Sequence, residues 1–256
     1  MLGAVVGDVI GSAYEWNNVK WTDFDLFTPL TTFTDDSVMT LATANSIMTG
    51  ASYERSYREL GNTHIGRGYG GMFLEWLNDP SMEPYNSWGN GSAMRVSPIG
   101  LAFDDEKDVL REAQRSAEVT HGHPEGVKGA QATALAVFMA RRGASKDDIR
   151  SEITGRFGYD LSRTVDDIRP DYYFNESCQG TVPEAIVAFL DSESFEDAVR
   201  LAVSLGGDSD TLACIAGAIA HAFYGEIPLP ISVKVESLLS KDLKVIMEKF
   251  CRKYCI

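Results

Sequence analysis

The amino-acid sequence predicts an all-α fold of one domain that spans residues 1–256. Two patterns support this prediction. Apolar residues recur every three to four positions through most of the chain, as on the buried face of a helix, whereas the alternating β-branched runs typical of strands are scarce. Hydrophobic residues make up 44% and charged residues 23% of the chain, a balance that excludes an intrinsically disordered protein. Usual helix and loop lengths leave room for about ten or more helices.

The first helix is expected over Gly3–Ala13, and the second over Ser37–Thr49, where an Asp-Ser pair suits a helix N-terminus. Pro124 suits the first turn of a long buried helix that ends near Gly143. An irregular, loop-rich insertion is expected over Gly155–Asn175. Apolar periodicity predicts further helices at Glu106–Val119, Val182–Leu190, Phe195–Leu205, Leu212–Phe223 and Ile231–Phe250.

Small residues line two of these helices. Gly3, Gly7 and Gly11 repeat every four positions, as do Ala213 and Gly217. Glycine costs about 1 kcal/mol relative to alanine inside a helix. The repeat therefore predicts a close helix–helix contact whose packing offsets this cost. A membrane dimerisation motif is excluded, since the N-terminal run is short and contains an aspartate.

The composition narrows the class of partner. Lys and Arg number 23 against 37 Asp and Glu, so the net charge is −14, which argues against a nucleic-acid surface and against anionic membranes. Leu212–Tyr224 is too short to span a bilayer, and the first residues lack the basic region of a secretory signal. The four cysteines include no Cys-x-x-Cys pair, which disfavours a zinc ribbon. We expect a cytoplasmic protein with reduced thiols and a monomer.

Two short segments concentrate oxygen ligands just ahead of predicted helices: Thr34-Asp35-Asp36 and Gly206-Gly207-Asp208-Ser209-Asp210-Thr211. Carboxylates with a hydroxyl form a hard-oxygen set that suits Mg²⁺ or Mn²⁺. Each segment alone is more typical of a helix N-cap, and the two together leave a cap and a metal site as balanced alternatives. An EF-hand is excluded because Ala213 and Ile219 occupy its glycine and glutamate positions.

Three other motifs have both a functional and a plain structural interpretation. Gly89-Asn90-Gly91-Ser92-Ala93 precedes a predicted helix and suits either a phosphate cradle or a capped turn. Gly66–Gly71 predicts a loop, in which Tyr69 is available to stack on a ligand. His121 and His123 precede the long buried helix, as ligand contacts or as capping residues. Glu15 is a candidate general base.

Taken in order along the chain, these segments resemble the ADP-ribosylglycohydrolase family. The resemblance implies a compact all-α domain with two Mg²⁺ or Mn²⁺ ions. The implied metal ligands are Thr34, Asp35, Asp36, Asp208, Asp210 and Thr211. Glu15 corresponds to a mobile glutamate of the family. The implied substrate contacts are Tyr69, Asn90, Gly91, Ser92, Ala93 and His121. The chain departs from the family at Ser209, where threonine is commoner, and we expect an outward side chain there.

The resemblance implies hydrolysis of the glycosidic bond at C1″ of an ADP-ribosylated protein or small-molecule conjugate. The catalytic candidates are Glu15 as base and the carboxylates that stabilise positive charge at C1″, Asp35, Asp36 and Asp210. Arginine is the first expected acceptor, with serine, acetyl, phosphate and nucleobase conjugates open. Two alternatives remain: a module that binds ADP-ribose without turnover, and a Mg²⁺-dependent all-α enzyme acting on diphosphates, which the absence of a third aspartate after Asp36 disfavours.

Overall fold

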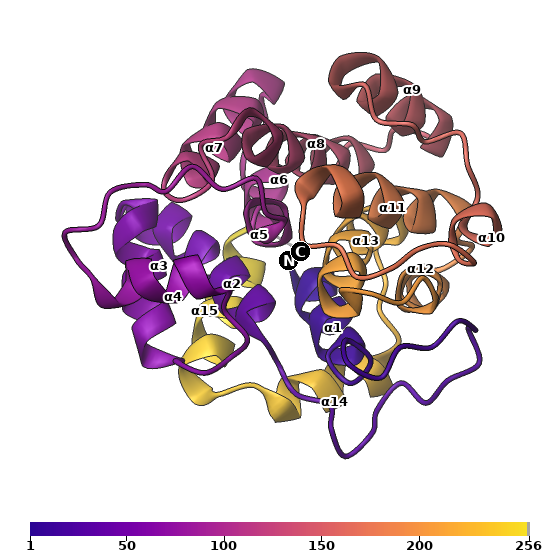
Figure 1. Ribbon diagram of the computed structural model, residues 1–256, viewed down its shortest axis with the longest axis horizontal. Coiled ribbons are helices and arrows are strands. Elements are labelled where there is room, and N and C mark those ends of the chain that lie inside the picture. Colours follow the sequence, from indigo (N-terminus) through magenta and orange to yellow (C-terminus); the bar gives the residue numbers. More distant parts are fainter. Residues whose placement is uncertain (255–256) are drawn as a thin grey trace.

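The computed structural model describes residues 1–254, which form fifteen α-helices and no β-strand (Figure 1). The helices are α1 (Leu2–Gly11), α2 (Asp35–Thr49), α3 (Tyr53–Thr63), α4 (Gly71–Asn78), α5 (Gly91–Met94), α6 (Ser97–Ala102), α7 (Glu106–Glu118), α8 (Pro124–Arg141), α9 (Lys146–Phe157), α10 (Val165–Ile168), α11 (Cys178–Asp191), α12 (Phe195–Ser204), α13 (Ser209–Tyr224), α14 (Leu229–Leu238) and α15 (Lys241–Tyr254).

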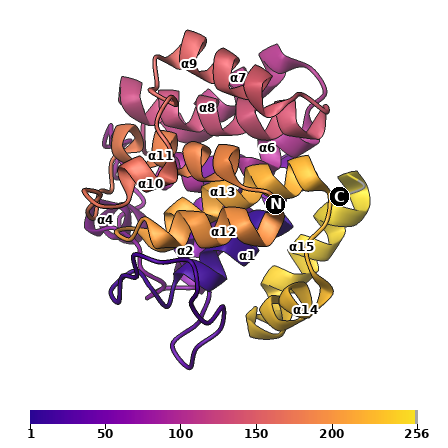
Figure 2. The ribbon, with the colours of Figure 1, turned by 90° about the vertical axis from the view of Figure 1, so that its right-hand side faces the viewer.

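Helices α1 and α13 form the centre of the molecule. Every residue of α13 from Ser209 to Ala220 is buried, as is α1 from Gly3 to Gly11. Helices α7, α8 and α9 cover one side of this centre, and α14 and α15 lie at the opposite side (Figures 1 and 2). The N-terminal ends of α2 and α13 begin inside the protein, where Asp36 and Ser209 are buried and Asp35 is partly buried.

The glycine repeat brings α1 and α13 into backbone contact. A methyl group at Gly3, Gly7 or Gly11 would overlap main-chain atoms of α13, with the carbonyl of Ala213 directly against Gly7. Gly217 meets the carbonyl of Gly3 in the same way. The predicted close approach is thus confirmed, and it fixes the register of α13 against α1.

Several predicted boundaries differ from the structure. The expected single helix over Ile231–Phe250 is wrong: the chain breaks between α14 and α15, where Leu239 is extended (ψ 150°). The break places the Leu239 side chain in the core, and the Ser240 hydroxyl bonds the Asp242 carboxylate (2.6 Å) at the start of α15. The insertion expected over Gly155–Asn175 is irregular except for the end of α9 and the short helix α10.

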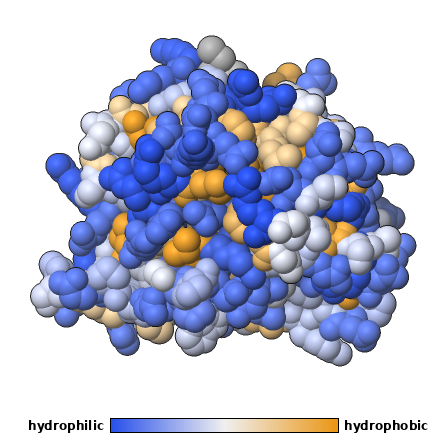
Figure 3. Space-filling view, turned by 90° about the horizontal axis from the view of Figure 1, so that it is seen from above, coloured by the Kyte–Doolittle hydropathy of each residue, from blue (hydrophilic) through white to orange (hydrophobic). Residues whose placement is uncertain are grey.

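The outer surface is mainly polar. The face over α7, α8 and α9 is predominantly hydrophilic, with apolar residues scattered in small groups (Figure 3). Among the described helices, none combines the length and the apolar character that crossing a bilayer requires.

Candidate functional site

A cavity of about 350 Å³ opens where the N-terminal ends of α2, α5 and α13 meet. The predicted site residues that line it are Glu15, Asp35, Asp36, Asn90, Gly91, His121, Asp208, Asp210 and Thr211. Four predicted residues lie outside its wall: Thr34, Tyr69, Ser92 and Ala93. The cavity therefore joins motifs from both ends of the chain, and the role of each residue in it remains a prediction.

Asp8 holds the N-terminus of α2 in place. Its buried carboxylate accepts hydrogen bonds from the backbone N–H groups of Thr34 and Ser37 (both 3.1 Å) and from their hydroxyls. The Thr34 hydroxyl in turn accepts from the Asp36 N–H (3.2 Å) and caps the helix. Asp8 is absent from the predicted site residues, although an acid within a stripe of small and apolar residues is a signal for such an anchor.

A second set of contacts positions the N-terminus of α13. Gly206 and Gly207 have φ values of +74° and +71°, which favour glycine. The amide of Asn90 donates to the Asp208 carboxylate (2.6 Å), and so connects α5 to this turn. Ser209 is fully buried and its hydroxyl donates to the Gly11 carbonyl (3.0 Å), so the expected outward orientation is wrong. The serine fits because α1 packs directly against this turn.

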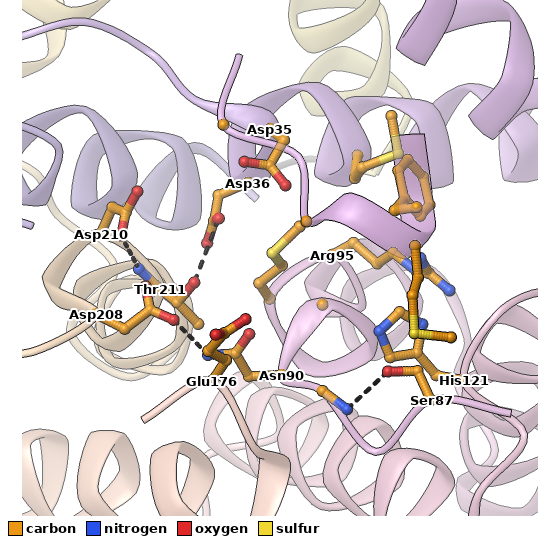
Figure 4. A pocket seen from close by; sticks show the side chains of 18 of the residues that line it. Asp35, Asp36, Ser87, Asn90, Arg95, His121, Glu176, Asp208, Asp210 and Thr211 are labelled. Atoms are coloured by element: carbon orange, nitrogen blue, oxygen red, sulfur yellow. Dashed lines mark hydrogen bonds between the residues drawn. The ribbon is translucent and has the colours of Figure 1, made fainter. Parts of the chain in front are cut away.

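The two acidic segments meet in the cavity (Figure 4). The Thr211 hydroxyl donates to Asp36 (3.3 Å), although the two residues are 175 positions apart. Carboxylate oxygens of Glu15, Asp208 and Asp210 lie within 4.8 Å of one another. A single pocket thus collects acidic side chains from the end of α1, from α2 and from α13.

Burial and mutual repulsion raise the pKa of these acids. The pKa values of Asp35, Asp36 and Asp210 lie well above their usual range, first because the groups are buried and second because neighbouring carboxylates oppose their ionisation. The same two causes raise the pKa of Glu15 to about 7. Among residues 1–254 no basic side chain lies within ion-pair distance of these four acids, and Oδ1 of Asp36 is buried without a hydrogen-bond partner.

These observations fit divalent cations. Crowded carboxylates without a basic partner are costly unless positive charge offsets them. Carboxylate and hydroxyl oxygens are the donors that Mg²⁺ and Mn²⁺ prefer. The orphaned oxygen of Asp36 is a free ligand position on the cavity wall.

The glycine-rich segments lie on either side of this acidic cluster. The N–H of Asp35 donates to the Arg67 carbonyl (2.8 Å), so the loop that contains Tyr69 crosses the start of α2. Tyr69 itself is buried, stacks on Phe73 (5.4 Å between ring centroids) and is not among the residues that line the cavity. Ser92 is also turned away, and its hydroxyl donates to the Gly126 carbonyl (2.7 Å).

His121 and His123 have different surroundings in the structure. His123 accepts from the Glu125 N–H (3.1 Å) and caps α8. His121 is buried, lines the cavity, and has its Nδ1 2.7 Å from the Thr120 hydroxyl. Of the pair, His121 is therefore positioned to contact a ligand.

Sequence reasoning missed the residues at the cavity mouth. Trp16 stacks on Phe174 (5.4 Å, interplanar angle 22°), and both rings are exposed. Glu176 lines the same rim, where its carbonyl accepts from the Asn90 N–H (2.7 Å). Arg95 lines the cavity beside His121, away from Asp208 and Asp210 (Figure 4). Exposed aromatic residues in loops were the available signal, but loop geometry decides which of them reach the cavity.

Comparisons with known proteins agree with this architecture. A family model described as ADP-ribosylglycohydrolase matches residues 1–254. The chain is 28% identical to ADP-ribosylhydrolase ARH3 of Homo sapiens, over 90% of this chain and 85% of that protein. It is 26% identical to ADP-ribosylarginine hydrolase Tri1 of Pseudomonas putida, over 90% of this chain and 71% of that protein. A solved structure described as an ADP-ribosylglycohydrolase-related protein complex has a TM-score of 0.74 and 27% identity, covering 98% of this chain and 95% of its own. The predicted all-α fold is thus confirmed.

Proposed function

The chain belongs to the ADP-ribosylglycohydrolase family, and from this membership we propose that it is a divalent-metal-dependent hydrolase of ADP-ribosylated arginine. The hydrolase class follows from the family, whereas the metal and the acceptor are argued from the cavity. The convergence of two acidic segments on one cavity is the observation that carries the proposal.

The proposed metal ligands come from both segments: Thr34, Asp35, Asp36, Asp208, Asp210 and Thr211. When bound, two Mg²⁺ or Mn²⁺ ions would supply the positive charge that these acids lack and a point of attachment for ribose hydroxyls. Asn90 keeps the Asp208 carboxylate oriented by donating to its Oδ2. Thr34 lies outside the cavity wall, and its hydroxyl donates to Asp8 and accepts from the Asp36 N–H. Among these residues it therefore has the fewest free oxygen lone pairs for a metal ion.

Glu15 is the proposed general base. Its carboxylate is only half-buried and lies beside Asp208 and Asp210, and its pKa of about 7 suits proton transfer near neutral pH. Water forms a bond to C1″ as the C1″–N bond breaks, and the bonding electron pair leaves with the guanidine nitrogen. Glu15 accepts the proton that the water loses, and that proton then passes to the departing nitrogen, so that arginine leaves with its guanidinium restored and Glu15 is again ionised.

Positive charge develops at C1″ when the leaving group departs. The carboxylates of Asp35, Asp36 and Asp210 face the cavity and would stabilise that charge electrostatically. Because they are held at helix N-termini by the packing of α1, α2 and α13, they need little rearrangement during the reaction.

The mouth of the cavity favours a cationic, planar acceptor. A guanidinium group stacks well on aromatic faces and pairs with carboxylates. The exposed Trp16–Phe174 stack and the carboxylate of Glu176 provide both contacts at the rim. The relative Tri1 is an ADP-ribosylarginine hydrolase by name, whereas the name ADP-ribosylhydrolase ARH3 specifies no acceptor.

The proposal is tested with a panel of ADP-ribosyl conjugates linked through arginine, serine, acetyl, phosphate and nucleobase groups. Release of free ADP-ribose is measured by chromatography at fixed Mg²⁺ or Mn²⁺. We expect the arginine conjugate to have the highest kcat/KM, and Trp16→Ala to lower it selectively. Trp21→Ala is the matched control, since Trp21 is exposed but lies outside the cavity wall. Tight ADP-ribose binding without turnover of any conjugate would contradict the proposed hydrolase activity and indicate a binding module instead.

A further inference from the structure

Arg95 is a buried cation at the end of the cavity away from the acidic rim. Its side chain is 1% exposed and it lines the cavity beside His121 (Figure 4). Among residues 1–254, its guanidinium pairs with no carboxylate within ion-pair distance. A buried charge without a counter-ion is unfavourable. The Arg95 charge must therefore be compensated by the ligand or by the groups of the cavity wall.

The contacts of the guanidinium are specific. Nη2 donates to the carbonyl of Ser116 (2.8 Å) and to the hydroxyl of Thr120 (3.0 Å), and Cζ lies 4.3 Å from the ring centroid of Tyr57. Nε is buried without a partner. Arg95 is therefore fixed by α7 and by the segment that leads to His121.

These contacts determine the direction of the next hydrogen bond. A guanidinium can only donate, so the Thr120 hydroxyl accepts from Arg95. The Thr120 hydroxyl is fully buried and keeps one proton to donate, and among residues 1–254 Nδ1 of His121, at 2.7 Å, is the acceptor within hydrogen-bond distance. With Nδ1 as an acceptor, the proton of the neutral imidazole resides on Nε2.

Nε2 faces the glycine loop. A Cβ built on Gly91 would lie 3.0 Å from Nε2, and one built on Gly89 would lie 3.5 Å from it. Within the described chain, Nε2 has no protein partner in a hydrogen bond. Burial and the nearby Arg95 charge hold the pKa of His121 well below its usual value, so the imidazole is neutral. Its one N–H is free to donate to a ligand.

We propose that Arg95 is a positioning residue that acts through Thr120 to fix the Nε2–H tautomer of His121, the histidine that the family resemblance already implies as a substrate contact, so that its N–H meets an anionic oxygen of the ligand. The unpaired guanidinium adds positive potential for the anion, and the imidazole adds the directed hydrogen bond. Under the proposed function, on which this assignment of the ligand rests, the oxygen belongs to the diphosphate. The distal ribose then lies toward the acidic cluster.

The tautomer is tested by ¹⁵N NMR of the imidazoles, which is tractable because the chain has only four histidines. Comparison with His121→Gln assigns the signals. We expect wild type to have the Nε2–H form and a hydroxyl-bearing Thr120→Ser variant to keep it. Thr120→Val, which has nearly the same shape, should lose the fixed tautomer. An Nδ1–H form in wild type, or an unchanged tautomer in Thr120→Val, would overturn the relay.

Binding is tested by calorimetry with ADP as the anionic probe and adenosine as the neutral one. Thr120→Val and Arg95→Met should raise the Kd for ADP about tenfold, the usual effect of losing one directed contact, and should change adenosine binding much less. Equal losses for both probes would show a general structural role instead. If Arg95→Met does not fold, Thr120→Val alone decides the question. These measurements do not depend on turnover, so a chain that hydrolyses no conjugate would defeat the proposed function and leave this result standing.

Discussion

Replacing Asp210 by asparagine is expected to stabilise the metal-free protein while abolishing hydrolysis. Asp210 is buried, and its neighbours Asp208, Asp36 and Glu15 all oppose its ionisation. Asparagine keeps the shape and the oxygen that accepts from the Thr211 N–H (3.0 Å). The substitution therefore removes a repelled charge without removing this hydrogen bond.

The size of the effect follows from the separations. Each pair among Glu15, Asp208 and Asp210 has oxygens within 4.8 Å. At an effective dielectric constant of about 20, two like charges at that distance repel by about 3.5 kcal/mol. Proton uptake relieves much of this repulsion, which leaves a net gain of about 1–3 kcal/mol above about pH 7. Each kcal/mol raises Tm by about 2–4 °C in a chain of this size.

The assay is thermal unfolding of the chelated proteins at several pH values, repeated with Mg²⁺. The advantage of Asp210→Asn should disappear at about pH 3, below the pKa of an aspartate in the unfolded chain, where the carboxylates are protonated in both states. Mg²⁺ should stabilise wild type and not the variant. Asp147→Asn is the control, because Asp147 is exposed on α9 and should lose a small amount of stability. A chelated Asp210→Asn protein that is less stable than wild type near pH 8 would refute the electrostatic reasoning.

Four further outcomes are expected. Chelated wild type should lose stability as pH rises from 4.5 to about 7, because the folded protein keeps a proton on Glu15 that the unfolded chain has released; denaturant titration checks this. Gly7→Ala should destabilise by about 3 kcal/mol through overlap with α13, whereas Gly155→Ala, which meets open space on α9, should stabilise by up to about 1 kcal/mol. Asn90→Leu should lower stability by about 1–3 kcal/mol and reduce kcat, since it removes the donor to the turn before α13. His123→Ala should cost about 1 kcal/mol as a lost helix cap and leave ADP-ribose release unchanged. Stability gained in Gly7→Ala, or activity lost in His123→Ala, would contradict the packing and the site described here.

The fold was predictable where its signals are local. A glycine every fourth position puts Gly3, Gly7 and Gly11 on one side of a helix, so a close contact follows from spacing alone. The break between α14 and α15 is different. Apolar periodicity continues through Leu239, and the helix ends there because the core offers that side chain a place, which is a property of tertiary structure.

The site divides in the same way. Acidic and glycine-rich motifs at helix N-termini are visible in the sequence, and the structure brings most of them to one cavity. Tyr69 differs because a ring in a glycine-rich loop can face a ligand or the core, and Phe73, the third residue of α4, provides the apolar partner. The roles of Asp8 and Arg95 depend on which groups surround them in space. No local pattern reports a carboxylate that receives four hydrogen bonds or a guanidinium that lacks a counter-ion.

The most direct test of the central claim is the rate at which ADP-ribosyl-arginine releases free ADP-ribose, measured with Mn²⁺ or Mg²⁺, after chelation, and after the metal is restored. Asp36→Asn is measured beside wild type, since Asp36 connects the two acidic segments. The account predicts release that stops on chelation, returns with the metal, and is absent from the variant. Undiminished release by chelated wild type or by Asp36→Asn would contradict it.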